Sequence, residues 1–117
     1  MRVLVCGGRD YLDYNKLDNT LFDLLDIGIT GKEHVIIQGG AIGADFLSKV
    51  FAYEYELNCE SYPANWKKYG KTAGPIRNQQ MLDEGKPDLV VAFPGGVGTA
   101  DMVKRAKNSG VDVVEIT

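Results

Sequence analysis

Phe93-Pro94-Gly95-Gly96-Val97-Gly98-Thr99-Ala100-Asp101 is the stretch of sequence that organises this chain. It follows a short apolar run, residues 89–92, and leads into a helix-like segment over residues 100–108. A strand, a glycine turn and a helix start together place backbone N–H groups at the positive end of a helix dipole. Such a nest of N–H groups favours anions such as phosphate. The stretch therefore predicts an anion-binding turn between a strand and a helix.

Two further glycine turns have the same context. Residues 6–10 (Cys-Gly-Gly-Arg-Asp) and 38–45 (Gln-Gly-Gly-Ala-Ile-Gly-Ala-Asp) each follow an apolar run and precede a helical pattern. Asp13 and Gly28 are the expected cap and stop of the first helix. The hydrophobic pattern predicts further helices over residues 42–57, 75–85 and 100–108, and strands over residues 2–6, 34–38, 58–62, 88–93 and 111–116.

The alternation of strands and helices predicts right-handed βαβ units. The expected fold class is α/β, a Rossmann-like three-layer sandwich with a five-stranded parallel sheet, and residues 1–117 are expected to form one domain. Residues 58–62 are the least apolar strand and are expected at an edge. The carboxyl ends of parallel strands lie at one edge of the sheet, where ligands bind. The three glycine turns are therefore expected to meet there, beside a long basic loop over residues 63–74.

The composition, with 44% hydrophobic and 25% charged residues, is typical of a globular domain. Because no apolar run is long enough to span a bilayer and the first residues lack a signal-peptide pattern, we expect a cytoplasmic protein without a membrane partner. Cys6 and Cys59 have no metal-type spacing and are expected to be buried and reduced. His34 begins a strand at the edge opposite the turns, so neither a catalytic triad nor a metal site is expected, and no cofactor is implied.

Charge is unevenly distributed along the chain. The net charge is −3, which does not favour general attraction to DNA or RNA. Residues 63–80 nevertheless contain Lys67, Lys68, Lys71 and Arg77 and no acidic residue. A local basic segment on an acidic protein suits a small anionic ligand better than a polyanion.

The second helix has an unusually wide apolar surface. It carries one stripe at Phe46, Val50, Tyr53 and Leu57 and a second at Leu47 and Phe51. One sheet face would not cover a surface of this width, which points to a homo-oligomer. The alternative is a helix packed deeply within its own domain.

Three glycine turns at one expected edge favour a phosphate or nucleotide site over three simple connections. The dinucleotide fingerprint and the P-loop are absent, so an NAD dehydrogenase or an NTPase is disfavoured. The candidate ligand-binding residues of the turns are Gly7, Gly8, Arg9, Asp10, Gly39, Gly40, Gly43, Asp45, Pro94, Gly95, Gly96, Gly98 and Thr99. Three further candidate ligand-binding residues lie in the segment between the second and third turns: Trp66, Arg77 and Asn78.

Several of these residues have two interpretations. The three acidic residues that follow the turns are either helix-start carboxylates or groups that bind ribose or transfer protons: Asp10, Asp45 and Asp101. Trp66 either stacks on a base or fixes its loop to the domain. Thr99 either binds phosphate or caps its helix. Arg77 is expected in the first turn of its helix, where a cation opposes the dipole, and this favours pairing with phosphate.

Taken together, residues 7–10, 39–45, 73–81 and 93–100 resemble the SLOG superfamily, and within it the small YspA-like proteins of bacteria and phages. The superfamily includes Lonely Guy phosphoribohydrolases and the DNA-processing DprA proteins. The resemblance implies a Rossmann-like domain that binds a nucleotide or a nucleotide-derived signal. Some members of the superfamily cleave the N-glycosidic bond of nucleoside monophosphates.

Two motifs of the Lonely Guy enzymes bear on catalysis. Their Arg-Lys-x-x-Met motif matches residues 77–81, except that Asn78 replaces the Lys. Their Pro-Gly-Gly-x-Gly-Thr-x-x-Glu motif matches residues 94–99, but Met102 stands at the position of the catalytic Glu. The resemblance therefore implies a retained phosphate site and a catalytic role for Arg77, but the family's catalytic carboxylate is missing. A hydrolase would need Asp101, which precedes Met102, or else Asp45 or Asp10, as its catalytic carboxylate.

Three functions remain open at this point. The chain could be a sensor or sequestering module for a nucleotide or nucleotide-derived small molecule, with phosphate held by residues 95–99 and 39–43. It could instead be an N-glycosidase or phosphoribohydrolase acting on a nucleoside monophosphate. A third function is that of a DprA-like accessory protein that binds single-stranded DNA, although the net charge of −3 agrees poorly with it.

Overall fold

The structure is a computed structural model that describes residues 1–27 and 33–117. Its elements follow in the order β1 (Arg2–Cys6), α1 (Tyr14–Leu24), β2 (Val35–Gln38), α2 (Ala44–Glu54), β3 (Asn58–Ser61), α3 (Trp66–Tyr69), a 3₁₀ turn (Gly70–Thr72), α4 (Ala73–Gly85), β4 (Leu89–Ala92), α5 (Val97–Asn108) and β5 (Asp112–Glu115). The described strands form one parallel sheet in the order β3-β2-β1-β4-β5. This confirms the predicted α/β fold and the edge position of the strand over residues 58–62.

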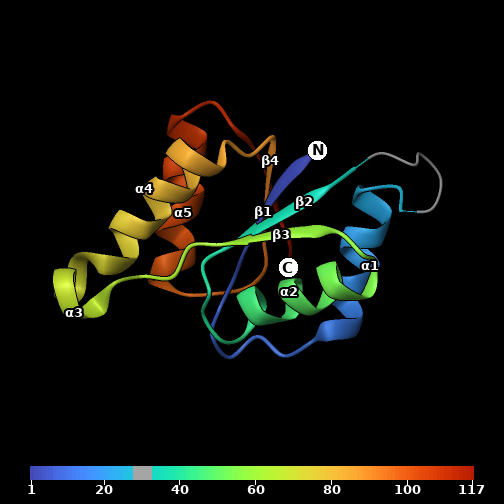
Figure 1. Cartoon of the computed structure of the whole chain (residues 1–117), viewed down its shortest axis with the longest axis horizontal. Coiled ribbons are helices and arrows are strands. Elements are labelled where there is room, and N and C mark those ends of the chain that lie inside the picture. The colour runs from blue at the N-terminus through green and yellow to red at the C-terminus, as the bar shows by residue number, and fades with distance from the viewer. Residues whose placement is uncertain (28–32) are drawn as a thin grey trace.

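The sheet lies between two layers of helices (Figure 1), with α1 and α2 on one face and α3, α4 and α5 on the other. Alternate residues of β1 supply the two cores, as the period of two in a strand requires. Val3 and Val5 pack towards α1 and α2, whereas Leu4 and Cys6 pack towards α4 and α5. Because both faces are covered, the central strands consist of nearly continuous apolar residues.

Helix boundaries differ from the sequence prediction at the functional edge. Helix α5 begins at Val97, within the glycine turn, and Gly96 is its N-cap, so the interpretation of Thr99 as a cap is wrong. The segment over residues 63–74 is not one long loop, because it contains α3 and the 3₁₀ turn. Helix α4 starts at Ala73, two residues earlier than predicted.

These earlier starts change the local electrostatic argument. Arg77 is the fifth residue of α4 and not part of its first turn, so opposition to the dipole does not explain its place. Asp101 is likewise the fifth residue of α5 and not a helix-start carboxylate. Asp13 caps α1 as predicted, since its carboxylate accepts from the N–H of Lys16 at 3.1 Å. Gly28, the predicted stop of this helix, lies outside the described residues.

The two cysteines differ in burial. Cys6 is buried, and burial raises the pKa of its thiol to about 12. Cys59 is exposed because β3 is the edge strand, so the expectation of two buried thiols is wrong. Both are free cysteines.

Helix α2 covers the sheet with only part of its apolar surface. Phe51 and Ala52 are buried, whereas Phe46 and Tyr53 remain 56% and 85% exposed. Deep packing of the whole helix within its own domain is therefore not observed. Among the described residues, no helix is both long and apolar enough to cross a membrane.

Candidate functional site

The three glycine turns meet at the carboxyl edge of the sheet. They are the β1–α1 turn (residues 7–10), the β2–α2 turn (39–43) and the β4–α5 turn (93–99). The N–H of Gly8 donates to the carbonyl of Pro94 at 2.9 Å, and the N–H of Ala44 donates to the carbonyl of Gly8 at 3.1 Å. The β1–α1 turn therefore joins the other two through its backbone.

The turns can approach one another this closely because glycine has no side chain. A β-carbon at Gly7 would lie 2.6 Å from that of Ala44, and one at Gly95 would lie 2.7 Å from the backbone nitrogen of Gly8. Gly43 has a φ of +79°, and a β-carbon there would lie 2.5 Å from the carbonyl oxygen of Arg9. Several of the glycines that predicted a ligand site therefore serve to pack one turn against another.

A cavity of about 470 Å³ opens beside the turns. It brings together eleven of the predicted site residues: Gly7, Gly8, Arg9, Asp45, Trp66, Arg77, Asn78, Gly96, Gly98, Thr99 and Asp101. The predicted residues outside its lining are Asp10, Gly39, Gly40, Gly43, Pro94 and Gly95. Sequence reasoning did not select the remaining lining residues, which are Cys6, Ala41, Lys71, Gly74, Pro75, Met81 and Val97.

The sequence contained a signal for some of the cavity-lining residues that were not predicted. Lys71 belongs to the basic segment over residues 63–80, but the sequence did not distinguish it from Lys67 and Lys68. Cys6 and Met81 also belong to the core below the cavity, so their apolar character indicated only burial. Tyr69, the other aromatic residue of the basic segment, lies instead in a separate groove over α4.

N–H groups of the β2–α2 turn donate hydrogen bonds to side chains of the residues that flank the turn. The N–H of Gly40 donates to Gln38 Oε1 at 2.5 Å, and the N–H of Ala41 donates to Asp45 Oδ2 at 3.2 Å. Burial raises the pKa of the Asp45 carboxyl, although the Ala41 N–H and the Arg77 guanidinium act in the opposite direction. This turn therefore already holds a carboxylate of the protein where a ligand anion was expected.

Both α2 and α5 have a glycine N-cap without a side-chain cap hydrogen bond, so the β4–α5 turn differs from the β2–α2 turn in its surroundings. A β-carbon at Gly96 or Gly98 would have no heavy atom within 4 Å, so this turn borders open space. The first N–H groups of a helix have no partner inside the helix. An anion in the cavity would find its backbone donors here.

Arg77 is fixed on two sides. Its Nη1 donates to the carbonyl of Gly39 at 2.6 Å, and its Nε donates to Asn78 Oδ1 at 3.1 Å. A β-carbon at Gly39 would lie 2.8 Å from Arg77 Cζ and 2.9 Å from Asp45 Oδ2, so glycine leaves the space that the guanidinium occupies. Burial lowers the pKa of Arg77 and nearby Asp45 raises it, yet an arginine stays charged in proteins.

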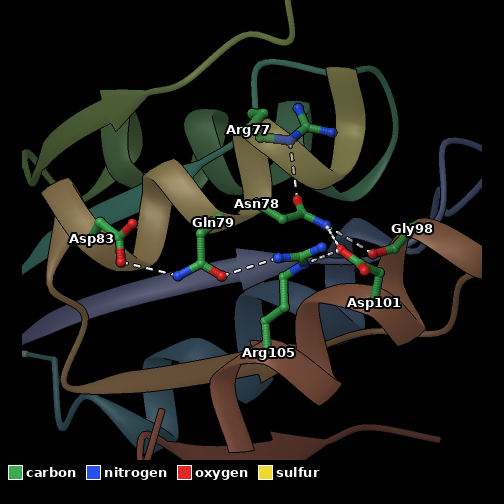
Figure 2. Close-up of polar contacts among 7 residues, drawn as sticks. All are labelled: Arg77, Asn78, Gln79, Asp83, Gly98, Asp101 and Arg105. Carbon is green, nitrogen blue, oxygen red and sulfur yellow. Dashed lines mark hydrogen bonds and ion pairs between the residues drawn. The ribbon is translucent and has the colours of Figure 1, made fainter. Parts of the chain in front are cut away.

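Asn78 and Asp101, which both line the cavity, belong to one polar network (Figure 2). Asn78 Nδ2 donates to the carbonyl of Gly98 at 3.2 Å and to Asp101 Oδ2 at 2.9 Å. Arg105 Nε also donates to Asp101 Oδ2, at 2.9 Å. Met102 is fully buried in the core, so the position of the Lonely Guy glutamate does not reach the cavity, whereas Asp101 does.

Cationic and aromatic groups line the outer part of the cavity. Arg9 Cζ lies 5.5 Å from the ring centroid of Trp66, close enough for a cation–π contact. The Trp66 side chain is half exposed, and Lys71 also lines the cavity. Arg9, Lys71 and Arg77 together make the cavity attractive to an anion.

In the part of the chain that the structure describes, no three His, Cys, Asp or Glu side chains lie close enough together to hold a metal ion. His34 is buried just before β2, at the opposite edge of the sheet from the turns, as predicted. The cavity lining offers arginine, lysine, carboxylate, amide, hydroxyl and thiol side chains together with backbone N–H groups.

Comparison with known proteins identifies the family. Residues 1–69 match the YspA, cpYpsA-related SLOG family. The Gene 61 protein of Mycobacterium phage D29 is 33% identical over 120 residues, which cover 97% of this chain and 94% of that protein. The chain belongs to this SLOG family. The family membership that the motifs implied is thus confirmed, and it indicates a nucleotide-related function.

Solved structures agree with the fold. TM1055, a structural genomics target, matches with a TM-score of 0.70 at 18% identity over 96% of this chain and 71% of that chain. A UDP-GlcNAc 2-epimerase from Neisseria meningitidis, solved with UDP-GlcNAc bound, matches with a TM-score of 0.59 at 17% identity. The match covers 99% of this chain but 32% of the epimerase. At these identities the likeness to this SLOG domain is one of fold.

Proposed function

We propose that this SLOG protein binds a nucleotide or nucleotide-derived small molecule in the cavity, as a sensor or a sequestering module. The observation that carries the proposal is the half-buried guanidinium of Arg77, which is held by two hydrogen bonds and lines a cavity that the uncapped start of α5 also borders. A guanidinium and helix-start N–H groups together recognise phosphate. The volume of about 470 Å³ lies within the usual range of small-molecule sites, about 300–1,000 Å³.

The base and the ribose of a nucleotide would also contact residues that line this cavity. Phosphate would lie at Gly96 to Thr99 against Arg77, and Trp66 would cover the base. For the ribose hydroxyls, Asp45 is a better acceptor than Asp10, since Asp45 lines the cavity and Asp10 does not.

Calorimetry tests this proposal with a panel of nucleoside mono- and diphosphates, cyclic nucleotides and ADP-ribose. We expect at least one ligand to bind, and Arg77→Ala to weaken its binding by roughly 10- to 100-fold, the effect of losing a charge-assisted hydrogen bond. Lys104→Ala is the matched control, because it removes the same charge from an exposed site on α5 outside the cavity. If no ligand of the panel binds at millimolar concentration, the proposal fails.

Asp45 favours a second candidate function, hydrolysis of the N-glycosidic bond of a nucleoside monophosphate. A buried carboxyl with a raised pKa, in the same cavity as an arginine, is a suitable general acid or base. Asp101 lies in the cavity too, but its Oδ2 already accepts from Asn78 and Arg105. Release of free base and ribose 5-phosphate, lost in Asp45→Asn and in Arg77→Ala, is the expected result. Nucleotides that stay intact through prolonged incubation would exclude it.

The DprA-like alternative gains no comparable support, since the net charge of −3 does not favour binding to a polyanion. A titration of single-stranded DNA at low salt is expected to show no binding.

A further inference from the structure

We propose that Asn78 is a positioning residue, which sets the orientation of the Arg77 guanidinium and joins it to the start of α5. The inference rests on the proposed function, because Arg77 and the β4–α5 turn are the two groups that would bind phosphate. Asn78 would act through both of them and not by touching the ligand itself. Its side chain would thus fix the position of Arg77 relative to the β4–α5 turn before the ligand binds.

The Asn78 amide is buried and bonded at both ends. The residue is 5% exposed. Its Oδ1 accepts from Arg77 Nε at 3.1 Å, while its Nδ2 donates to the Gly98 carbonyl at 3.2 Å and to Asp101 Oδ2 at 2.9 Å. Rotating the amide by half a turn would set its oxygen against two other oxygens and its NH₂ group against an N–H donor. The neighbours therefore dictate one orientation of the amide.

This orientation decides which edge of Arg77 remains available. Nε is bonded to Asn78 and Nη1 to the carbonyl of Gly39, so the guanidinium plane is fixed at two points. Within the described residues, Nη2 makes no hydrogen bond, and Arg77 lines the cavity. A planar group held in this way loses less entropy when it binds an anion than a free side chain would.

Asp101 and Arg105 hold Asn78 from the other side (Figure 2). Asp101 Oδ2 accepts from both Asn78 and Arg105, so Arg105 balances the charge that faces the amide. Arg105 Nη1 also donates to Gln79 Oε1 at 3.1 Å. This arrangement makes Asp101 an acceptor that orients Asn78, which is a different role from that of a catalytic group.

The side-chain chemistry of Asn78 is suited to this role in a way that lysine is not. In the Lonely Guy motif that residues 77–81 resemble, lysine stands at this position. A lysine ammonium donates hydrogen bonds but accepts none, so it could not accept from Arg77 Nε. An asparagine both accepts from the arginine and donates to α5.

NMR tests the inference directly, because the exchange of the Arg77 Nε–H proton reports its hydrogen bond. Arg77→Lys assigns the signal by its disappearance. In Asn78→Ala we expect this proton to exchange on the order of tenfold faster and inorganic phosphate to bind on the order of tenfold more weakly, as for loss of a hydrogen bond to a charged group. Asn78→Asp retains the acceptor for Arg77 Nε and is expected to retain slow exchange, although its second oxygen faces the Gly98 carbonyl and Asp101 Oδ2 and should lower stability. Gln80→Ala, an amide lost from the same helix outside the cavity, is the matched control and is expected to change neither quantity.

The outcomes separate the two proposals. If wild-type protein binds phosphate and Asn78→Ala changes neither exchange nor affinity, the positioning role is wrong and the proposed function stands. If wild-type protein binds neither phosphate nor any nucleotide of the panel, the proposed function fails and the inference fails with it. Should Asn78→Ala not fold, Asn78→Lys replaces it: loss of slow exchange supports the inference, and retention of slow exchange overturns it.

Discussion

The β2–α2 turn and the β4–α5 turn have similar sequences but different roles in the structure. Both follow a buried strand, contain three glycines and start a helix. The first directs its N–H groups at Gln38 and Asp45 and leaves room for Arg77. The second borders open space at Gly96 and Gly98. A glycine turn therefore indicates a ligand site only when no part of the protein already occupies it.

The largest expected effect tests this difference through stability. In Gly43→Ala the new β-carbon would meet the carbonyl oxygens of Gly8 and Arg9, which are backbone atoms, at a φ of +79°. We expect a loss of about 3 kcal/mol or more in the free energy of unfolding, from steric strain that cannot relax. Gly98→Ala faces open space and is expected to stay within about 0.5 kcal/mol of the wild type. Urea denaturation measures both; equal destabilisation would remove the distinction between the two turns.

A second prediction concerns the space that Gly39 leaves for Arg77. In Gly39→Ala the guanidinium must move, because the new β-carbon would lie 2.8 Å from its Cζ. We expect ligand affinity to fall by roughly tenfold and stability by about 1–2 kcal/mol, as for moderate overpacking. A double variant with Arg77→Ala should bind no more weakly than Arg77→Ala alone, since both changes act on one side chain. Additive losses, measured by calorimetry, would show that Gly39 acts by another route.

The pH dependence of stability sharpens the same comparison, because Asp45 is the carboxylate that fills the β2–α2 turn. Burial raises its pKa in the folded state above the ordinary value of 3.8. The folded protein then holds this proton more tightly than the unfolded chain, so the contribution of Asp45 to stability is lost as pH rises through the folded pKa. The wild type should lose stability relative to Asp45→Asn as the pH rises from the ordinary pKa of 3.8 through the raised pKa of the folded state. Urea titrations across this range check the sign, and the opposite trend would contradict the assigned burial effect.

The smallest effect concerns the helices that follow the two turns. Helix α2 leaves Phe46 and Tyr53 exposed on one apolar stripe, whereas the most exposed large apolar residue of α5 is Val97, within its first turn. Self-association through α2 therefore remains our prediction. Light scattering should give a mass above that of the 12.8 kDa chain, and Phe46→Asp with Tyr53→Asp should lower it to that of the monomer. A monomeric wild type at high concentration would refute this prediction.

The sequence predicted the fold because hydrophobic periodicity depends on local geometry alone. Continuous β-branched runs such as residues 35–37 are typical of strands buried on both faces, and the glycine turns marked the edge where they end. Within the described residues, the predicted strands and their parallel arrangement are confirmed. The predicted starts of two helices were wrong: α4 begins at Ala73 and α5 at Val97, each earlier than predicted. A helix can begin before a proline or within a glycine turn, and the sequence pattern did not reveal this.

The sequence by itself determined the βαβ order, the edge at which the turns meet and the local excess of positive charge between residues 63 and 80. Only the tertiary structure decided which of the turns lies open. The backbone carbonyl groups of the two turns accept hydrogen bonds from a distant segment, because Arg77 of α4 donates to Gly39 in the β2–α2 turn and Asn78 of α4 donates to Gly98 at the start of α5. Hydrogen bonds between segments depend on distances that no local pattern encodes. For this reason the sequence located the edge where the turns meet, whereas the fold decided which side chains line the cavity there.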